Sequence, residues 1–267
     1  MILQFPTSNK STREIKMARS AMGFIVSLLL VASSVAVMAA TLGDWDFADA
    51  TFYGDMSGSA TMGGDCGYGD LFEQGYGLAN TAVSGVLFNN YQTCGACYEV
   101  ECYNDQARCK EGSITVTVTS LCPPAPDGGG LCQLPRKHFD MAEVSYLKLA
   151  TSPIAGSIPI RFRRVTCVKT GGIRFQIKGN PWWILVLVYN VGGSGDVAAV
   201  SIKGSNSDKW IAMQRQWGQN WQVTMMPELR GQGLSFQVTT GDGKMVESDN
   251  VAPANWQFGQ IFEGKQF

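Results

Sequence analysis

Strict alternation of apolar and polar residues marks several segments in the first half of the chain as strands. The run Ile114–Thr119 reads Ile-Thr-Val-Thr-Val-Thr, and Ile158–Arg163 and Ile173–Ile177 alternate in the same way. A period of two places successive side chains on opposite faces of a sheet, so each run predicts a half-buried strand. A helical period follows Asp140, where MAEVSYLKLA has apolar residues spaced by three. Residues 41–178 are therefore expected to form a β-rich barrel with one or two short helices.

Short strand-like runs separated by turns every 8–12 residues fill the second half of the chain, which is typical of a β-sandwich. Gly241-Asp242-Gly243 is a hairpin turn signal among them. The pattern breaks near Lys178–Pro181, so we expect a second domain over residues 179–267. The predicted strands are Trp183–Tyr189, Val197–Lys203, Trp210–Gln214, Trp221–Met225, Leu234–Thr239 and Lys244–Val246.

A longer apolar run lies near the N-terminus. Residues 1–20 carry four basic residues and one acidic residue, and an apolar stretch over 21–40 ends in small residues. This order is typical of a secretory signal peptide, here cleaved near Ala39/Ala40. A transmembrane anchor is the alternative, because the run is nearly long enough to span a bilayer. Three serines within the run and the lack of a basic flank after it favour cleavage, and we predict residues 1–40 to be a signal peptide.

Charge excludes several classes of partner. The 267 residues carry 21 Lys and Arg against 22 Asp and Glu, and without residues 1–40 the net charge would be about −4. No basic surface is available to hold nucleic acid, so we expect no nucleic-acid partner, and at most peripheral association with a wall or membrane surface.

The only histidine, His138, excludes a multi-histidine metal site. We expect a monomer without metal or cofactor.

All eight cysteines lie between Cys66 and Cys167. In a secreted chain an even number favours four disulfides, but 105 pairings are possible and spacing alone leaves the connectivity open. Cys94-Gly-Ala-Cys97 also fits a redox dithiol, or a zinc site together with Cys102 and Cys109. Structural crosslinks are the favoured interpretation.

Six of the seven tryptophans lie between Trp182 and Trp256. Core packing is the ordinary role of tryptophan, but adjacent Trp182 and Trp183 in a strand would point to opposite faces. Polar neighbours in QRQWGQNWQ suggest exposure of Trp217 or Trp221. Exposed indoles on one flat face would stack on sugar rings. The pattern leaves two alternatives, a carbohydrate-binding face or core residues with scattered surface ones.

The candidate chemistry rests on carboxylates, because glycoside hydrolysis needs two of them. Asp140 lies beside the only histidine and is the candidate acid; Asp55 is its candidate partner, and Asp65 lies in the glycine-rich stretch nearby. On the residues alone, Asp140 also fits a helix N-cap and His138 a structural hydrogen-bonding residue.

Long motifs in the same order resemble the plant α-expansins. The match runs from about Trp45 to Phe267. The matching segments are TFYGD at 51–55, TMGGDCGYGDL at 61–71, LFNN at 87–90, CGACYEV at 94–100, CPP at 122–124, KHFD at 137–140, RRV at 163–165, GGIRF at 171–175, LVLVYNVGGSGDV at 185–197, WGQNW at 217–221 and NVAPANWQFGQ at 250–260.

The resemblance implies a mainly β fold, with a six-stranded double-psi β-barrel similar to that of family-45 endoglucanases followed by an immunoglobulin-like β-sandwich that binds cellulose. It implies secretion to the plant cell wall and acid-dependent, non-hydrolytic loosening of contacts between cellulose and matrix glucans such as xyloglucan. The protein would then not be an enzyme. Three alternatives are a β-1,4-glucan endohydrolase with Asp140 as general acid, a wall-binding module without loosening activity, and a secreted dithiol oxidoreductase.

The resemblance also assigns residues by position. The implied disulfides are Cys66–Cys94, Cys97–Cys167, Cys102–Cys109 and Cys122–Cys132. The groove candidates are Thr51, Tyr53, Asp55, His138 and Asp140, of which Asp55 is not assigned as a base. The polysaccharide-binding candidates are Trp182, Trp183 and Trp217, with Trp221 added from its polar neighbours.

The chain departs from the family pattern in four places, one of which is a segment of three residues. Asp65 stands where alanine is usual, and Thr119–Leu121 replaces Thr-Asn-Phe, which removes a polar side chain from the groove. Thr166 replaces a proline and Ala198 a frequent histidine. We expect these changes to alter the fine structure of the groove and not the fold.

Overall fold

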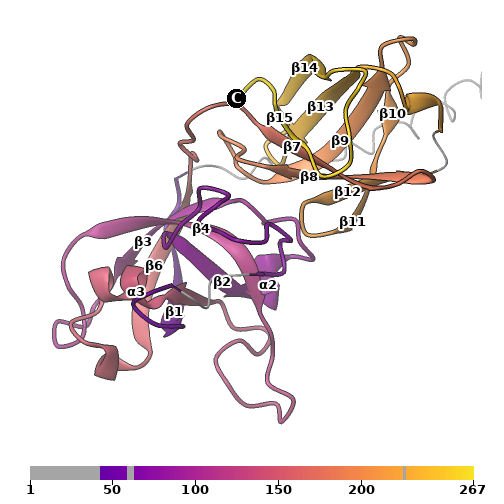
Figure 1. Cartoon of the computed structure of the whole chain (residues 1–267). Helices are drawn as coiled ribbons and strands as arrows, with labels where there is room; N and C mark the ends of the chain where they lie inside the picture. Colours follow the sequence, from indigo (N-terminus) through magenta and orange to yellow (C-terminus); the bar gives the residue numbers. More distant parts are fainter. Residues whose placement is uncertain (1–42, 59–62, 225–226) are drawn as a thin grey trace, which may run out of the picture. The chain divides into compact units, whose positions relative to one another are not determined.

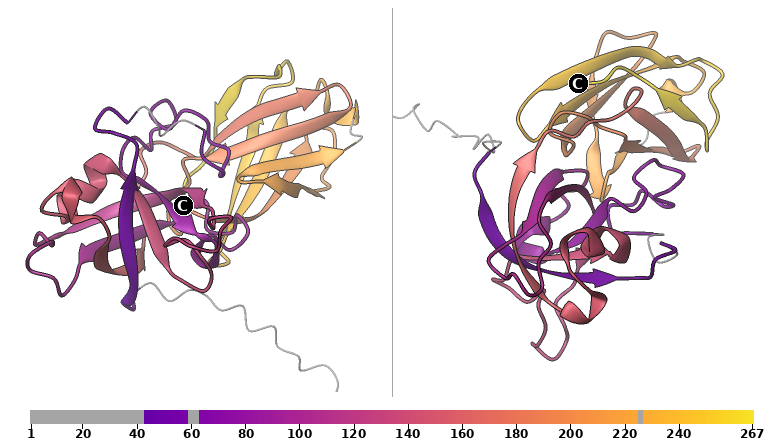
Figure 2. Two further views of the ribbon diagram at one scale, coloured as in Figure 1. Left: turned by 90° about the horizontal axis from the view of Figure 1, so that it is seen from below. Right: turned by 90° about the vertical axis from the view of Figure 1, so that its left-hand side faces the viewer.

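The computed structural model describes residues 43–58, 63–224 and 227–267, so the predicted signal peptide lies outside the described residues. The described chain is mainly β: a closed six-stranded barrel is followed by two sheets of four and five strands. Figure 1 shows the barrel strands in indigo to pink and the sandwich strands in orange to yellow, and Figure 2 gives two further views. The predicted fold class is confirmed. No helix among the described residues is long and apolar enough to cross a membrane.

The barrel closes in the strand order β1-β5-β2-β4-β3-β6. Two pairs, β1 with β5 and β2 with β4, are parallel, and the other neighbours are antiparallel. Its interior is filled by fully buried apolar side chains such as Val83, Val116 and Phe139. The elements are β1 (Asp46–Tyr53), β2 (Asn80–Ser84), α2 (Gly85–Phe88), β3 (Cys97–Cys102), β4 (Ser113–Cys122), β5 (His138–Ala142), α3 (Glu143–Leu149), a 3₁₀ turn (Pro153–Ala155) and β6 (Ile158–Val165).

The sandwich has one sheet in the order β11-β12-β8-β7-β15 and a second in the order β10-β9-β13-β14. Their inner faces form one apolar core, at whose centre the rings of Phe175 and Phe236 stack with centroids 4.3 Å apart. The elements are β7 (Arg174–Asn180), β8 (Trp183–Tyr189), β9 (Val197–Gly204), β10 (Ile211–Ala212), β11 (Gln214–Trp217), β12 (Asn220–Thr224), a 3₁₀ turn (Pro227–Leu229), β13 (Leu234–Thr240), β14 (Met245–Ala252) and β15 (Ile261–Glu263). The expected boundary at 178–179 lies within β7, and the division into domains stays a prediction.

Most predicted strands are present, and β8 matches its prediction residue for residue. The predicted strand Trp210–Gln214 is instead two short strands, which belong to different sheets. The expected helix begins at Glu143 with Ala142 as its N-cap, so Asp140 is not a cap. Asp140 lies within β5 instead, because parallel pairing with β1 keeps the backbone in a strand conformation up to Ala142. Trp182 lies outside the strands, immediately before β8.

Four disulfides join all eight cysteines, in the pairs that the resemblance implies: Cys66–Cys94, Cys97–Cys167, Cys102–Cys109 and Cys122–Cys132. Cys94 and Cys97 have different partners, so they do not form the dithiol of an oxidoreductase. The same pairing leaves no thiolate for the alternative zinc site.

Candidate functional site

Strands β1 and β5 bring three of the predicted groove residues together. The two strands are parallel, and their register places Thr51 opposite Asp140. Tyr53 lies two residues beyond Thr51 and therefore on the same face of β1. The Tyr53 hydroxyl donates a hydrogen bond to Oδ1 of Asn80, a fully buried side chain at the start of β2. The strand register, rather than a loop, thus fixes these side chains.

The Thr51 hydroxyl joins the single histidine to Asp140. It donates to Oδ1 of Asp140 at 2.8 Å, and its oxygen lies 2.7 Å from Nε2 of His138. A hydroxyl has one proton to donate, so with that proton directed at Asp140 it accepts from an N–H at Nε2. This arrangement selects the Nε2-protonated tautomer of His138. The other ring nitrogen, Nδ1, is buried and has no hydrogen-bond partner in the described structure.

Burial sets the protonation of all three titratable groups. Desolvation raises the pKa of Asp140, and the hydrogen bond from Thr51 offsets only part of that effect. Desolvation lowers the pKa of His138 to about 4, opposed by nearby Asp49, so the ring stays neutral in mild acid. Desolvation, with the Asp140 charge added, raises the pKa of Tyr53 to about 12. Of the three groups, Asp140 is the one whose shifted pKa extends its protonated form to higher pH within the acid range.

A cavity of about 230 Å³ opens beside Asp140. Asp140 is the only carboxylate among its lining residues, and it faces backbone and hydroxyl groups of the C-terminal part of β4. Thr119, on that wall, has a buried hydroxyl with no partner in the described structure. A buried hydroxyl without a hydrogen-bond partner is energetically costly. The lining residues are Tyr53, Gly63, Gly64, Leu71, Ala82, Thr119, Ser120, Leu121, Cys122, Pro123 and Asp140.

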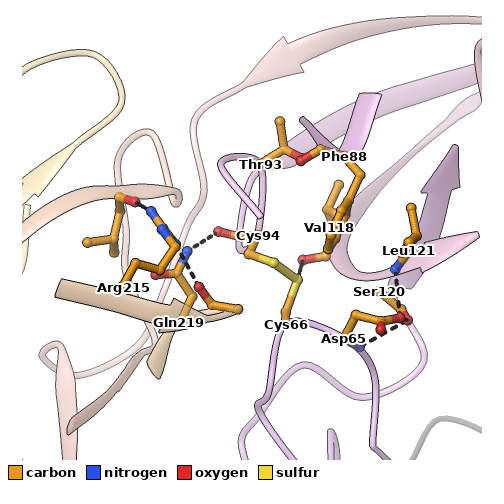
Figure 3. Close-up of a disulfide and its surroundings, with 12 residues drawn as sticks. Asp65, Cys66, Phe88, Thr93, Cys94, Val118, Ser120, Leu121, Arg215 and Gln219 are labelled. Carbon is orange, nitrogen blue, oxygen red and sulfur yellow. Dashed lines mark hydrogen bonds between the residues drawn. A yellow bond between two sulfur atoms is a disulfide. The ribbon is translucent and has the colours of Figure 1, made fainter. Parts of the chain in front are cut away.

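The other two candidate carboxylates lie outside this lining. Asp55 is exposed in the turn after β1, where Oδ1 accepts from the backbone N–H of Ser57 at 2.8 Å. Asp65 is also exposed. Its Oδ2 accepts from the Ser120 hydroxyl at 2.8 Å and from the Leu121 N–H at 3.2 Å (Figure 3). Two departures from the family pattern are thus in direct contact, and both Ser120 and Leu121 line the cavity.

The outer face of the five-stranded sheet carries the predicted aromatic residues. Ile184 and Val186 point into the sandwich core, so alternation places Trp183 on the outer face of β8. Trp217 pairs with Asn220, which pairs with Leu187 on that same outer face. Strand geometry separates Trp183 and Trp217 by about 17 Å.

Trp182, immediately before β8, is 78% exposed and Trp217 is 44% exposed. We call Trp182, Trp183 and Trp217 together the tryptophan face. Trp183 is half-buried, so all three rings retain accessible surface with which to stack on a flat ligand.

Trp221 is not part of the tryptophan face, and its predicted role in polysaccharide binding is corrected. Its side chain is 4% exposed and belongs to the sandwich core. The indole N–H donates to Oε1 of Gln219 at 3.2 Å, and the Arg215 guanidinium lies 4.3 Å from the ring centroid. The polar residues around it in the sequence alternate with it along β12, so they mark the opposite face of the strand.

Gln219, two residues after Trp217 in the chain, contacts both residues of the Cys66–Cys94 disulfide, and Figure 3 shows its side chain directed at Cys94. Its side-chain Nε2 donates to the Cys94 carbonyl at 2.9 Å, and its backbone N–H donates to the Cys66 carbonyl at 2.9 Å. The Cys66 N–H in turn donates to the carbonyl of Thr119 at 3.1 Å. Gly218 has φ +50°, and a Cβ there would overlap the Cys66 carbonyl, so this close approach requires glycine.

Three functional positions escaped the sequence analysis. Asn80 and Gln219 are buried polar residues whose roles depend on partners far away in sequence, and Thr119 is the unchanged residue of a segment noted only for its differences at Ser120 and Leu121. Gln219 is the central residue of the WGQNW motif, but that motif directed attention to its two tryptophans.

The fold and the site together define a two-part class of protein, in which a closed barrel with a groove beside Asp140 is followed by a β-sandwich with exposed tryptophans. Two family models match: one described as expansin C-terminal domain over residues 173–253, and one described as lytic transglycolase (DPBB_1) over residues 80–162. The chain belongs to the expansin family. It is 50% identical to expansin-A23 of Arabidopsis thaliana over 223 residues, which cover 83% of this chain and 80% of that one.

A rice relative and a bacterial crystal structure are also similar to this chain. Identity to expansin-A32 of Oryza sativa subsp. japonica is 48%, covering 84% of both chains. The crystal structure of an apo expansin from Clavibacter michiganensis superposes with a TM-score of 0.62 at 19% identity, covering 84% of this chain and 98% of that one. A mutant of that bacterial expansin, in complex with cellohexaose, matches with the same TM-score at 18% identity and the same coverage. At such identities the likeness shows a shared fold.

Proposed function

We propose that the chain is a secreted plant cell-wall protein that loosens non-covalent contacts between cellulose and matrix glucans such as xyloglucan, without hydrolysis and most strongly in acid. The observation that carries this proposal is the groove with Asp140 as the only carboxylate among its described lining residues. Hydrolysis of a glycosidic bond uses two carboxyl groups that flank it. Asp55 and Asp65 lie outside that lining and are engaged with other groups.

The tryptophan face supplies the second half of the proposal. Trp182, Trp183 and Trp217 would stack on a flat cellulose surface, because the axial C–H faces of glucose rings are apolar and match an indole in shape. A protein of the same fold has been crystallised with cellohexaose, which supports a glucan as the ligand class. The four disulfides are compatible with an oxidising, extracellular compartment.

Protonation of Asp140 explains the expected acid dependence. A protonated carboxyl group donates a hydrogen bond to a sugar oxygen, whereas a carboxylate only accepts. The raised pKa of Asp140 increases the protonated fraction in mild acid. Loosening breaks no covalent bond, so the protein acts by binding a displaced glucan chain more tightly than a paired one.

The test is the extension of heat-inactivated walls under constant load, with reducing-sugar release measured on the same samples. Extension at acid pH without sugar release supports the proposal. Sugar release in step with extension would instead identify an endohydrolase. Binding to cellulose without extension would identify a wall-binding module.

A further inference from the structure

A tryptophan outside the tryptophan face lies on the opposite side of the sandwich. Ile211 of β10 pairs with Ile202 of β9, and Ile202 is in the sandwich core. Lys203 follows Ile202 in β9 and so points to the outer face of the four-stranded sheet, where its ammonium contacts the ring of Trp210, the residue before β10. The outer faces of the two sheets of a sandwich point in opposite directions. Trp210 and the tryptophan face consequently address different volumes of solvent.

Trp210 lines a cavity of about 390 Å³, a size within the range of about 300–1,000 Å³ found for ligand sites. The ring is half-buried, and the ammonium of Lys203 lies 4.5 Å from its centroid. Lys203 is not among the residues that line the cavity. Its ammonium also lies 3.6 Å from Oδ1 of Asp249. The indole is thus in contact with a paired ammonium group and also borders the cavity.

The polar groups around the cavity favour an uncharged ligand with many hydroxyl groups. Lys209 and Glu228 line it and carry opposite charges, so it presents no excess of either sign. Ser207 also lines it; its oxygen accepts from the Lys209 N–H at 3.1 Å, which leaves its proton free to donate. An aromatic surface surrounded by one acceptor, one cationic donor and one hydroxyl matches the alternating C–H and O–H groups of a pyranose ring.

We propose that the Trp210 cavity is a second saccharide site, specific for a neutral hemicellulose chain end or side branch. This rests on the proposed function, because it assigns a matrix glucan to one outer face of the sandwich and cellulose to the other. One sandwich then holds two polysaccharides at once, on opposite sides of a single core.

The test uses the mature protein bound to microcrystalline cellulose and measures its capture of a soluble xyloglucan oligosaccharide. Wild-type protein captures it while bound. Trp210→Ala weakens capture about tenfold, as expected for loss of one stacking residue, and leaves cellulose binding within about twofold. Thr239→Ala, on the outer face of the same sheet but outside the cavity lining, is the matched control and leaves both unchanged.

Two conservative variants separate recognition from folding. Trp210→Phe keeps an aromatic surface and retains most of the capture, and Glu228→Gln removes the charged acceptor and weakens it about threefold. Unchanged capture by both Trp210→Ala and Glu228→Gln would overturn the proposal. So would tighter capture of an oligogalacturonate, since the balanced charges predict no preference for an anion.

Failure of the proposed function is distinguishable from failure of this site. Titration calorimetry of the free protein with the same oligosaccharide requires no cellulose. Trp210-dependent binding in solution together with absent cellulose binding supports the second site and contradicts the cellulose role of the tryptophan face. Cellulose binding without any Trp210-dependent capture supports that role and overturns the second site.

Discussion

Thr51 donates its hydroxyl proton to Asp140 across a pair of parallel strands in which the two residues are register partners, with 2.8 Å between Oγ1 and Oδ1. The bond stabilises the carboxylate and so opposes the desolvation that raises the pKa of Asp140. The pH at which Asp140 changes charge therefore depends on a neighbouring hydroxyl, and a variant can move it.

Replacing Thr51 by valine is expected to raise the pKa of Asp140 further, since it removes the hydrogen bond that favours the carboxylate and retains the burial. The acid limb of wall extension then moves toward neutral pH. The measurement is an NMR titration of the Asp140 carboxyl carbon alongside the extension profile. Thr51→Ser keeps the hydroxyl and is the control; a profile that does not move in Thr51→Val would exclude Asp140 as the titrating group.

His138 makes stability depend on pH in the opposite sense to Asp140. Its folded-state pKa of about 4 lies below the ordinary value of 6.5. Between these values the unfolded chain binds a proton that the folded chain does not, so the free energy of unfolding falls as pH drops from 6.5 to 4. We expect a loss of about 2 kcal/mol over this window.

Urea unfolding at pH 7, 5.5 and 4 measures this loss, and His138→Gln should remove it. The raised pKa of Asp140 acts the other way: the native state holds its proton to higher pH, and stability falls as pH rises through that range. Asp140→Asn should therefore flatten the opposite limb. A wild-type curve that gains stability toward pH 4 would contradict the assignment to His138.

The exposed and buried tryptophans should separate binding from stability. Trp182→Ala and Trp217→Ala are each expected to weaken cellulose binding about tenfold, with little change in the free energy of unfolding. Trp221→Ala removes a core ring and should cost about 3–5 kcal/mol. Depletion assays on cellulose and thermal unfolding measure the two effects. Equal loss of stability in all three variants would mean that the tryptophan face is structural.

Gln219 is expected to carry more stability than its polar character suggests. It is 1% exposed, and alanine at this position would leave the Cys94 carbonyl and the Trp221 indole N–H without their partner. Two unpaired buried groups cost about 2–4 kcal/mol together. Gln222, half-buried on the outer face of β12, is the matched control and should change stability by less than about 0.5 kcal/mol as alanine. Similar losses in the two variants would disprove this role for Gln219.

The strands and helices could be predicted wherever the hydrophobic periodicity of a segment indicates the same element as its pairing with distant strands. Strand β8 is apolar along its whole length, because its inner face lies in the sandwich core while Leu187 and Tyr189 on its outer face pack against the barrel core. Asp140 shows the limit. The helical period after it suggested a cap, but pairing with β1 holds it in a strand, and no local signal reveals a partner 89 residues away.

The site could be predicted only in part for the same reason. Family motifs indicated Asp140 and Trp217. Polar residues next to Trp221 in the sequence suggested that it is exposed, but its side chain lies on the buried face of β12 and theirs on the other face. The roles of Asn80 and Gln219 depend on contacts across more than twenty residues of sequence. These roles depend on strand register and burial, which are determined by long-range contacts and not by the local sequence.

The contact of Gln219 with the disulfide has a mechanical consequence. Two backbone hydrogen bonds in series, from Gln219 to Cys66 and from Cys66 to Thr119, connect the strand after Trp217 to the wall of the groove. In the proposed function, tension on a glucan bound to the tryptophan face would therefore be transmitted to the groove through these two hydrogen bonds, next to the covalent Cys66–Cys94 crosslink.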